Sequence, residues 1–292
     1  MKLTKQKQTK KMIQKQTKIS KFIFFLFLAS VLISLTSCST QKKHETNKID
    51  IKFIKDTVLD KKGFNRGYAV LEEIKVISSN KKVAEKLTNE LHRISMNDSL
   101  TSYLPEDRLS QKKIFYRECL DVNDSYYCKY IPESYKILLK TTSFLSIEYK
   151  YNSFYNPDEY FKYAVFNLVN GERLTYQKMF NNAETILGFY NDNYVSEIEG
   201  YLTELNKDDQ EELDEYNRYK SHIETRTPFK LQDLNNFEIV YDSTITKAKQ
   251  LKFHYNGQGG VYRRFFQPGF VEFNIEALKP YLTKEFKDQL GM

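Results

Sequence analysis

Residues 71–94, LEEIKVISSNKKVAEKLTNELHRI, change their hydrophobic period halfway along. Before Ser79, Ile74 and Val76 alternate with polar residues, which is the pattern of a half-buried strand. After Asn80, apolar residues recur every three or four positions, as in an amphipathic helix that faces a core. These positions are Val83, Leu87, Leu91 and Ile94. With Ser79 or Asn80 as its cap, the stretch predicts a strand followed by a helix.

Alternating patterns recur along the rest of the chain. The expected strands are 51–53, 68–76, 113–118, 126–130, 135–139, 144–151, 160–168, 237–241, 251–255 and 271–275. Further helices are expected at 187–205 and 275–289, with the acidic stretch 207–220 as a solvated helix or loop. Asn170-Gly171 is a strong turn dipeptide. Runs of strands followed by helices, without regular βαβ alternation, indicate an α+β fold with antiparallel sheets and packed helices.

The first 37 residues have the form of an export signal. Eight lysines and no acidic residue precede a fourteen-residue apolar run, 22–35. This run is shorter than the roughly 20 residues that span a bilayer, so a signal peptide is favoured over a transmembrane anchor. Leu35-Thr36-Ser37-Cys38 resembles the lipobox of bacterial lipoproteins. The resemblance implies cleavage before Cys38 and lipidation of its thiol; an ordinary signal with a chance cysteine is the alternative.

Cleavage before Cys38 changes the charge of the chain. The full sequence has a formal charge of +7, and the leader alone contributes eight lysines, so residues 38–292 carry 7 − 8 = −1. A nucleic-acid partner requires a basic patch in the folded part, and this balance argues against one. The expected partner is instead a membrane, held through the lipid anchor.

The mature chain divides into three expected parts. Residues 38–50 lack apolar residues until Ile49 and read as a flexible tether. Residues 51–150 and 151–292 are then expected to be an N-terminal and a C-terminal α+β segment. Their combined length suits one large domain or two small ones.

Two cysteines remain once Cys38 is assigned to the lipid. Cys119 and Cys128 enclose LDVNDSYY, and VNDS is a turn signal. An even pair in an exported chain favours a disulfide, here across two strands of a hairpin. Zinc is a poor alternative because two thiols without a nearby histidine do not make a tetrahedral set.

Four stretches, which together span most of residues 65–286, carry a family resemblance. They are residues 71–94, FNLVNGERLTYQKMF at 166–180, FEIVYDSTITKAKQLKFHYN at 237–256 and PGFVEFNIEALKPYLTKEF at 268–286. They resemble the extracytoplasmic domain of RsiV-type anti-sigma factors, which also accompanies PdaC-type peptidoglycan deacetylases. The resemblance implies a fold and an envelope setting, without catalysis. NSFYNPDEYF, 152–161, departs from the Gly-Gly-Ala-His-like turn that family members often carry there.

Residues with catalytic or metal-binding potential are few. No pair among the four histidines has metal-ligand spacing, and HExxH is absent. His92 reads as a boundary residue of the first helix. His254 is a candidate base near Glu272, although a lone strand histidine is usually structural. We therefore expect no catalytic residue, no metal and no cofactor.

A glycine-bearing loop is the best candidate for recognition. It contains Tyr262, Arg263, Arg264, Phe265 and Phe266. Arginine forks bind carboxylates in bidentate fashion, and aromatic residues anchor interfaces. The plainer interpretation has a phenylalanine pinning the loop to the core and the arginines in solvent.

These patterns lead to one main functional prediction. The protein is expected to be a lipid-anchored protein of the bacterial cell envelope that faces outside the cytosol. Its α+β part would bind an envelope protein or a peptidoglycan-related glycan without catalysis. A hydrolase directed at the cell wall is the alternative, and an inward-signalling sensor would need the leader to stay uncleaved.

Overall fold

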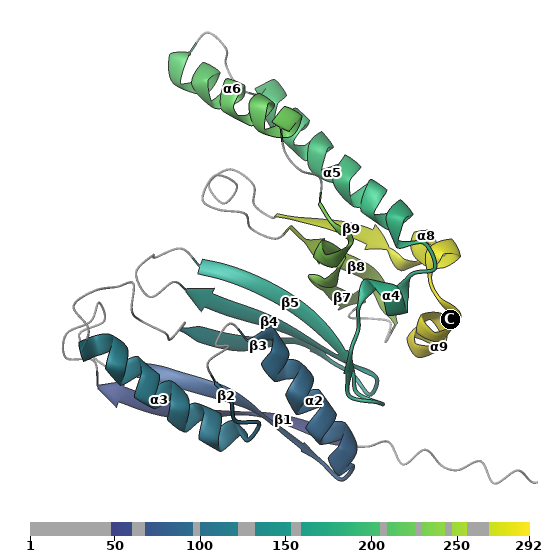
Figure 1. Cartoon of the computed structure of the whole chain (residues 1–292). Coiled ribbons are helices and arrows are strands. Elements are labelled where there is room, and N and C mark those ends of the chain that lie inside the picture. The colour runs from purple at the N-terminus through teal and green to yellow at the C-terminus, as the bar shows by residue number, and fades with distance from the viewer. Residues whose placement is uncertain are drawn as a thin grey trace, which may run out of the picture. The chain divides into compact units, whose positions relative to one another are not determined.

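The structure is a computed structural model in which one compact unit, Asn47–Met292, contains the described residues. These are residues 48–59, 68–95, 100–121, 132–152, 159–204, 209–225, 229–242, 247–255 and 269–292. Within them lie seven α-helices and three antiparallel sheets (Figure 1), so the predicted α+β class is confirmed. The leader, Cys38, most of the tether, Cys128 and the loop residues 262–266 lie outside the described ranges.

The first sheet is an antiparallel hairpin covered by two helices. It contains β1 (Ile49–Leu59) and β2 (Tyr68–Ser78), which pair along their whole length. Helix α2 (Lys81–Ile94) follows, and the side chain of Asn80 accepts a hydrogen bond from the amide of Val83, 3.3 Å. All four predicted apolar positions of α2 are buried. The strand-then-helix prediction for residues 71–94 is confirmed.

Helix α3 (Pro105–Asp121) corrects one prediction. Residues 113–118 were expected to form a strand, but they lie inside this helix. Proline in the first turn, followed by Glu106 and Asp107, suits a helix start. The helix was hidden because its buried face includes Arg108 and Lys112, which break the apolar stripe of an ordinary amphipathic helix.

The second sheet forms the centre of the described unit. Its strands are β3 (Glu133–Lys140), β4 (Phe144–Asn152), β5 (Glu159–Asn167) and β6 (Glu172–Arg173), in that spatial order. Strand β4 runs through the expected segment boundary at residues 150 and 151. Asn170-Gly171 forms part of the turn between β5 and β6, as predicted, with Gly171 at φ 75°.

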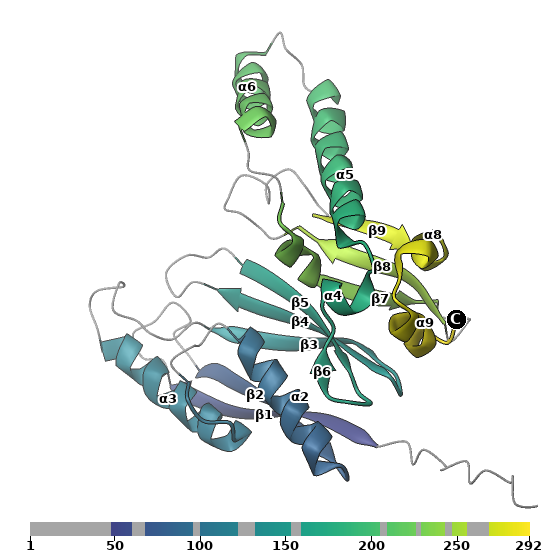
Figure 2. The same cartoon turned by 45° about the vertical axis from the view of Figure 1, so that its right-hand side comes forward.

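The third sheet and its helices complete the chain. The strands are β7 (Phe237–Tyr241), β8 (Ala248–His254) and β9 (Phe270–Asn274), in that order. The helices are α4 (Tyr176–Met179), α5 (Ala183–Glu204), α6 (Gln210–Thr225), α8 (Ile275–Leu278) and α9 (Lys284–Leu290), with 3₁₀ turns η2 (Leu231–Asn235) and η3 (Lys279–Tyr281). Figure 2 shows α5 beside this sheet, with α6 against the far part of α5.

Two large cores lie on opposite faces of the central sheet. One core joins Phe144 and Val165 to the third sheet and to α5, α8 and α9. The other joins Leu145 and Ile147 to α2 and the β1–β2 hairpin. The central strands therefore bury both faces, which fixes their register because a slip by one residue would exchange the faces. Among the described residues, no helix is long and apolar enough to cross a membrane.

Candidate functional site at the base of the β8–β9 loop

The predicted recognition loop begins and ends on two paired strand ends. Strand β8 ends at His254, which pairs with Phe270 at the start of β9. One residue further on, the amide of Tyr255 donates to the carbonyl oxygen of Gly269, 2.8 Å. Residues 262–266 belong to the connection between these stems and lie outside the described ranges. The described part of the site is therefore the stem, at the end of β8 and the start of β9.

His254 is held between an aromatic ring and a carboxylate. Its imidazole stacks on the ring of Tyr163 in β5, with centroids 3.4 Å apart and planes 8° apart. Its Nε2 lies 3.1 Å from Oε1 of Glu238 in β7. His254 is 8% exposed. The ring is thus fixed on two sides and has little access to solvent.

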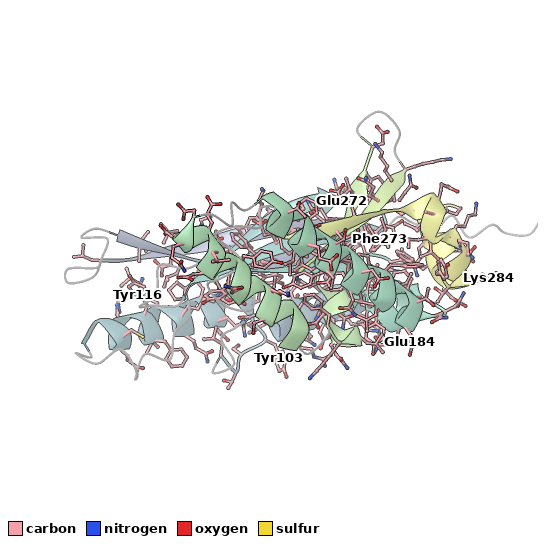
Figure 3. The ribbon with its side chains drawn as sticks, turned by 90° about the horizontal axis from the view of Figure 1, so that it is seen from above. Tyr103, Tyr116, Glu184, Glu272, Phe273 and Lys284 are labelled. Carbon is pink, nitrogen blue, oxygen red and sulfur yellow. The ribbon has the colours of Figure 1, made fainter. Side chains whose placement is uncertain are left out.

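The carboxylate partner of His254 differs from the predicted one. Glu272 lies opposite Lys252 in the β8–β9 register, and its Oε1 is 3.9 Å from the Lys252 ammonium. The hydrogen-bond partner of His254 is therefore Glu238 on the other neighbouring strand, while Glu272 is a diagonal neighbour across β9. Figure 3 labels Glu272 beside Phe273 on β9; Phe273 packs against the core, so strand alternation directs Glu272 to the other face.

The protonation states at this site follow from burial and pairing. Burial lowers the pKa of His254 and outweighs the opposing effect of Glu238. Burial alone would raise the pKa of Glu238, but hydrogen bonds from His254 and Lys252 hold it below its ordinary value. Burial and a hydrogen bond to Glu148 raise the pKa of Tyr163. A neutral imidazole beside an ionised Glu238 is the consistent state near pH 7.

We call Glu148, Tyr163, Glu238, Lys252 and His254 the junction cluster. Its side chains come from the central sheet and the third sheet and contact one another. Asn236 adds a backbone connection, since its Nδ2 donates to the carbonyl oxygen of His254, 3.0 Å, and its Oδ1 accepts from the amide of Tyr163, 2.7 Å. The arrangement clamps the end of β8 to β5. Sequence reasoning missed Asn236 and Tyr163 because their partners are distant along the chain.

The other side of the loop stem is aromatic. The ring of Tyr255 lies 5.0 Å from each of Tyr190 and Tyr194 in α5 and 5.7 Å from Phe229. Partial desolvation raises the pKa of Glu197, an exposed residue of α5, to about 7. Burial, and to a smaller extent the charge of Glu197, raises the pKa of Tyr255. The end of β8, with Tyr255, therefore lies between the junction cluster and an aromatic cluster.

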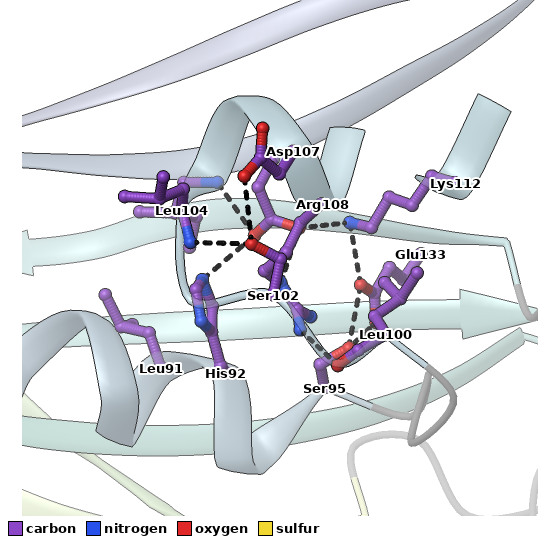
Figure 4. Close-up of polar contacts among 12 residues, drawn as sticks. Leu91, His92, Ser95, Leu100, Ser102, Leu104, Asp107, Arg108, Lys112 and Glu133 are labelled. Carbon is purple, nitrogen blue, oxygen red and sulfur yellow. Dashed lines mark hydrogen bonds and ion pairs between the residues drawn. The ribbon is translucent and has the colours of Figure 1, made fainter. Parts of the chain in front are cut away.

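A second polar cluster is buried between α2, α3 and the neighbouring strands (Figure 4). Lys112 of α3 lies 2.9 Å from Glu73 and 2.8 Å from Glu133, and Arg108 Nε lies 3.2 Å from Glu73. These four side chains are at most 3% exposed. Their formal charges cancel, which is the condition under which buried charges persist. We call these residues the buried ion cluster.

Neutral groups complete the buried ion cluster. Ser95 Oγ donates to Glu133, 2.9 Å, and the Tyr135 hydroxyl donates to the same carboxylate, 2.5 Å. His92 lies alongside with its side chain 7% exposed and its Nε2 3.8 Å from Glu73 Oε1, and within the described ranges neither ring nitrogen has a hydrogen-bond partner. Burial, aided by Arg108 and Lys112, lowers the pKa of His92 to about 3. His92 is thus a buried neutral residue rather than a surface base.

The cysteines are only partly described. Cys119 is buried on helix α3 and is disulfide-bonded. Cys128 lies outside the described residues, so the pairing of Cys119 with Cys128 stays a prediction. The expected hairpin geometry is wrong on the Cys119 side, since that residue is helical. In the described ranges, no group of three or more His, Cys, Asp or Glu side chains is placed to hold a metal ion.

No family model matches the sequence, and no curated protein matches it. Among solved structures, the chain is similar to a member of the DUF3298 family from Bacteroides fragilis, with 13% sequence identity and a TM-score of 0.43. The match covers 82% of this chain and 94% of that one.

Proposed function

We propose that the protein is a lipid-anchored protein of the bacterial cell envelope whose folded unit binds a ligand without catalysis. The ligand is a peptidoglycan-related glycan or an envelope protein. The leader and the Leu35–Cys38 tetrapeptide support the anchor. The junction cluster supports binding over catalysis, because Tyr163 and Glu238 already contact its histidine.

Catalysis requires a base that can reach substrate. His254 is covered by Tyr163 and bound to Glu238, and His92 is enclosed beside the buried ion cluster. Each imidazole therefore has a structural role in the described part of the chain. The junction cluster, with Asn236, holds the end of β8 against β5 and β7.

Recognition is assigned to the loop residues Tyr262–Phe266. Arg263 and Arg264 supply bidentate donors for carboxylates, which peptidoglycan peptides, lactyl groups and protein surfaces all carry. The aromatic neighbours supply apolar anchors. The stem contributes a fixed starting geometry, which reduces the ordering cost of binding.

The binding test compares two charge-matched double variants. Soluble protein with Cys38→Ser is mixed in one arm with purified, protein-free wall sacculi. In a second arm it is mixed with envelope extract and cross-linked to the proteins that it binds. Arg263→Glu with Arg264→Glu should reduce retention at least about tenfold, since each Arg lost from an interface centre commonly costs over 1 kcal/mol. Lys247→Glu with Lys249→Glu, exposed at the other end of β8, should retain binding. Equal retention by both variants would refute the loop assignment.

The two ligand classes separate in the same experiment. Binding to protein-free sacculi identifies the glycan or its peptide as the ligand. Binding restricted to a cross-linked protein, with no retention on sacculi, identifies an envelope protein. Absence of binding in both arms contradicts the proposed function.

One observation favours the alternative of a wall hydrolase. Partial desolvation raises the pKa of Glu197 to about 7, although the residue is exposed on α5, and a carboxylic acid that is partly protonated at neutral pH suits general-acid catalysis of glycoside cleavage. Release of soluble reducing ends from wall fragments would reveal this activity. Loss of that release in Glu197→Gln, His254→Gln or Glu272→Gln, with an unchanged urea midpoint of unfolding, would establish the enzyme and overturn the binding proposal.

The anchor is tested separately. Cys38→Ala removes the thiol that lipidation requires, and the variant should leave the detergent phase and appear in the aqueous phase. Two or more acyl chains make stable anchoring, at about 0.8 kcal/mol per buried methylene. A variant that stays in the membrane fraction would show that the apolar run itself, and not a lipid, holds the protein.

A further inference from the structure

The end of the folded unit that adjoins the tether is rich in lysine. Lys48 directly precedes β1, and Ile49 pairs with Ser78 at the end of β2. Helix α2 begins three residues later at Lys81. Both Figure 1 and Figure 2 show the start of β1 next to the start of α2. Lys48, Lys81 and Lys82 are exposed there.

Two further contacts bring more lysines to this end. Glu172, after the β5–β6 turn, lies 2.5 Å from Lys86 of α2 and 2.7 Å from Lys178 of α4. Lys140, at the end of β3, lies 3.6 Å from Asp50 of β1. These contacts connect strands and helices that are distant in sequence and place their lysines around one edge.

We call these six exposed lysines the tether-end rim. They are Lys48, Lys81, Lys82, Lys86, Lys140 and Lys178. Three acidic residues, Asp50, Glu85 and Glu172, lie among them, which leaves a formal charge of +3. Hydrogen bonds from Lys178 and Lys86 lower the pKa of Glu172 to about 2, so this carboxylate stays ionised and engaged with its lysines.

The rim is part of a wider separation of charge. Residues 183–225, which contain α5 and α6, hold twelve acidic and three basic residues, a charge of −9. Because the mature chain carries −1, its remaining residues carry +8. Two exposed aliphatic side chains also occur at the rim. Ile77, opposite Asp50, is 40% exposed, and Val169, beside the β5–β6 turn, is 53% exposed.

We propose that the tether-end rim docks on the anionic phospholipid headgroups of the membrane that holds the lipid anchor. This inference rests on the proposed lipidation of Cys38. Lys48 follows Cys38 by ten positions, which allows at most roughly 35 Å at full extension. The rim therefore stays near the bilayer, where an anionic surface attracts basic residues. Ile77 and Val169 add apolar contact at the interface.

Docking has a consequence for the binding unit. A chain held by lipid alone would rotate freely on its tether. Headgroup contacts at the rim would instead fix one edge of the unit against the bilayer. The attraction is electrostatic and acts within about 8–10 Å at physiological salt. It should therefore disappear at high ionic strength, while the lipid anchor remains.

The experiment measures vesicle binding by the chain from residue 39 onward, which retains the compact unit but lacks the lipidated cysteine. Vesicles contain phosphatidylcholine alone or three parts phosphatidylcholine to one part phosphatidylglycerol. The chain should co-sediment with the anionic vesicles only and be released at 0.5 M salt. Lys81→Glu with Lys82→Glu should weaken this binding about tenfold or more.

A matched variant controls for net charge. Lys220→Glu with Lys230→Glu makes the same charge change at exposed positions on α6 and before η2, and it should bind nearly as well as the unaltered chain. Equal weakening by the two variants, or no binding to anionic vesicles, would overturn the docking proposal. Neither result depends on the Cys38→Ala fractionation, so failure of docking and failure of lipidation are distinguishable.

Discussion

Gly171 rests directly on the backbone of helix α2, at the carbonyl oxygen of Val83. A β-carbon on Gly171 would lie 2.6 Å from that oxygen and 3.1 Å from the amide nitrogen of Leu87. Its φ of 75° is also in the left-handed region that glycine tolerates. The β5–β6 turn therefore packs against α2 only because this position has no side chain. The contact connects the central sheet to the helix predicted from residues 71–94.

Replacement of Gly171 by alanine should destabilise the protein strongly. The left-handed conformation costs an alanine about 1–2 kcal/mol, and the contact with Val83 adds a steric cost because backbone atoms cannot swing aside. We expect a loss of at least about 2 kcal/mol in the free energy of unfolding, measured by urea denaturation. Gly188→Ala in helix α5, where a β-carbon meets nothing within 4 Å, should be neutral or stabilising. Similar effects of the two substitutions would contradict the close contact.

Removal of the Lys112 ammonium should be among the most damaging single changes. Lys112→Met leaves Glu73 and Glu133 buried, with Arg108 as the remaining cation of the buried ion cluster. An uncompensated buried charge costs about 3–5 kcal/mol. Urea denaturation at pH 7 should show a loss of this size, together with weaker attachment of α3 to the β1–β2 hairpin by hydrogen exchange.

The neighbouring lysine provides the control for this prediction. Lys113 pairs with Asp56, 2.7 Å, and both side chains are more than a quarter exposed. Exposed pairs contribute about 0–1 kcal/mol, so Lys113→Met should have little effect. If Lys112→Met is no more destabilising than Lys113→Met, the buried ion cluster does not hold α3.

Local sequence patterns predicted helix α2 and the β5–β6 turn. Helix α2 was found because Val83, Leu87, Leu91 and Ile94 face one core, and the Asn170-Gly171 turn carries its signal in two residues. Helix α3 was missed because its buried face includes Arg108 and Lys112, which sequence periodicity counts as surface residues. Charged residues become core residues only through partners elsewhere in the chain.

The candidate site also depends on contacts between distant residues, which local sequence patterns do not show. His254 was correctly placed on a strand, opposite in direction to Phe253. Its contacts with Glu238 and Tyr163 depend on which strands neighbour β8 and on how the third sheet meets β5. Neither relationship leaves a signal near residue 254, because hydrophobic alternation specifies faces and does not specify neighbours.

His92 should make the protein lose stability as the pH falls, at pH values that are still above the range in which carboxylates titrate. Its pKa is about 3 in the folded protein and near 6.5 when unfolded. Between these values the unfolded chain binds a proton that the folded chain does not, so stability is full above pH 6.5 and declines as pH falls. One such group gives a slope of about 1.4 kcal/mol per pH unit at most.

Urea denaturation at pH 7.0, 6.0 and 5.0 measures this slope. His92→Gln removes the titrating group, so the variant should lose less stability than the unaltered protein between pH 6.0 and 5.0. His254, whose pKa is also lowered, remains in both proteins and cancels in the comparison. Parallel pH profiles for the two proteins would show that His92 titrates normally and is not enclosed.

The predicted disulfide between Cys119 and Cys128 should stabilise the end of helix α3. Cys119 is 4% exposed and lies in a small core with Val58, Leu71 and Tyr116. Closure of so short a loop contributes about 2–3 kcal/mol in the chain-entropy model, so Cys128→Ser should lower the free energy of unfolding by about that amount. Peptide mass spectrometry without reductant should recover the two cysteines in one cross-linked species. Recovery of Cys119 joined to Cys38 instead would contradict both the pairing and the lipidation, since Cys38 cannot carry a thioether lipid and a disulfide together.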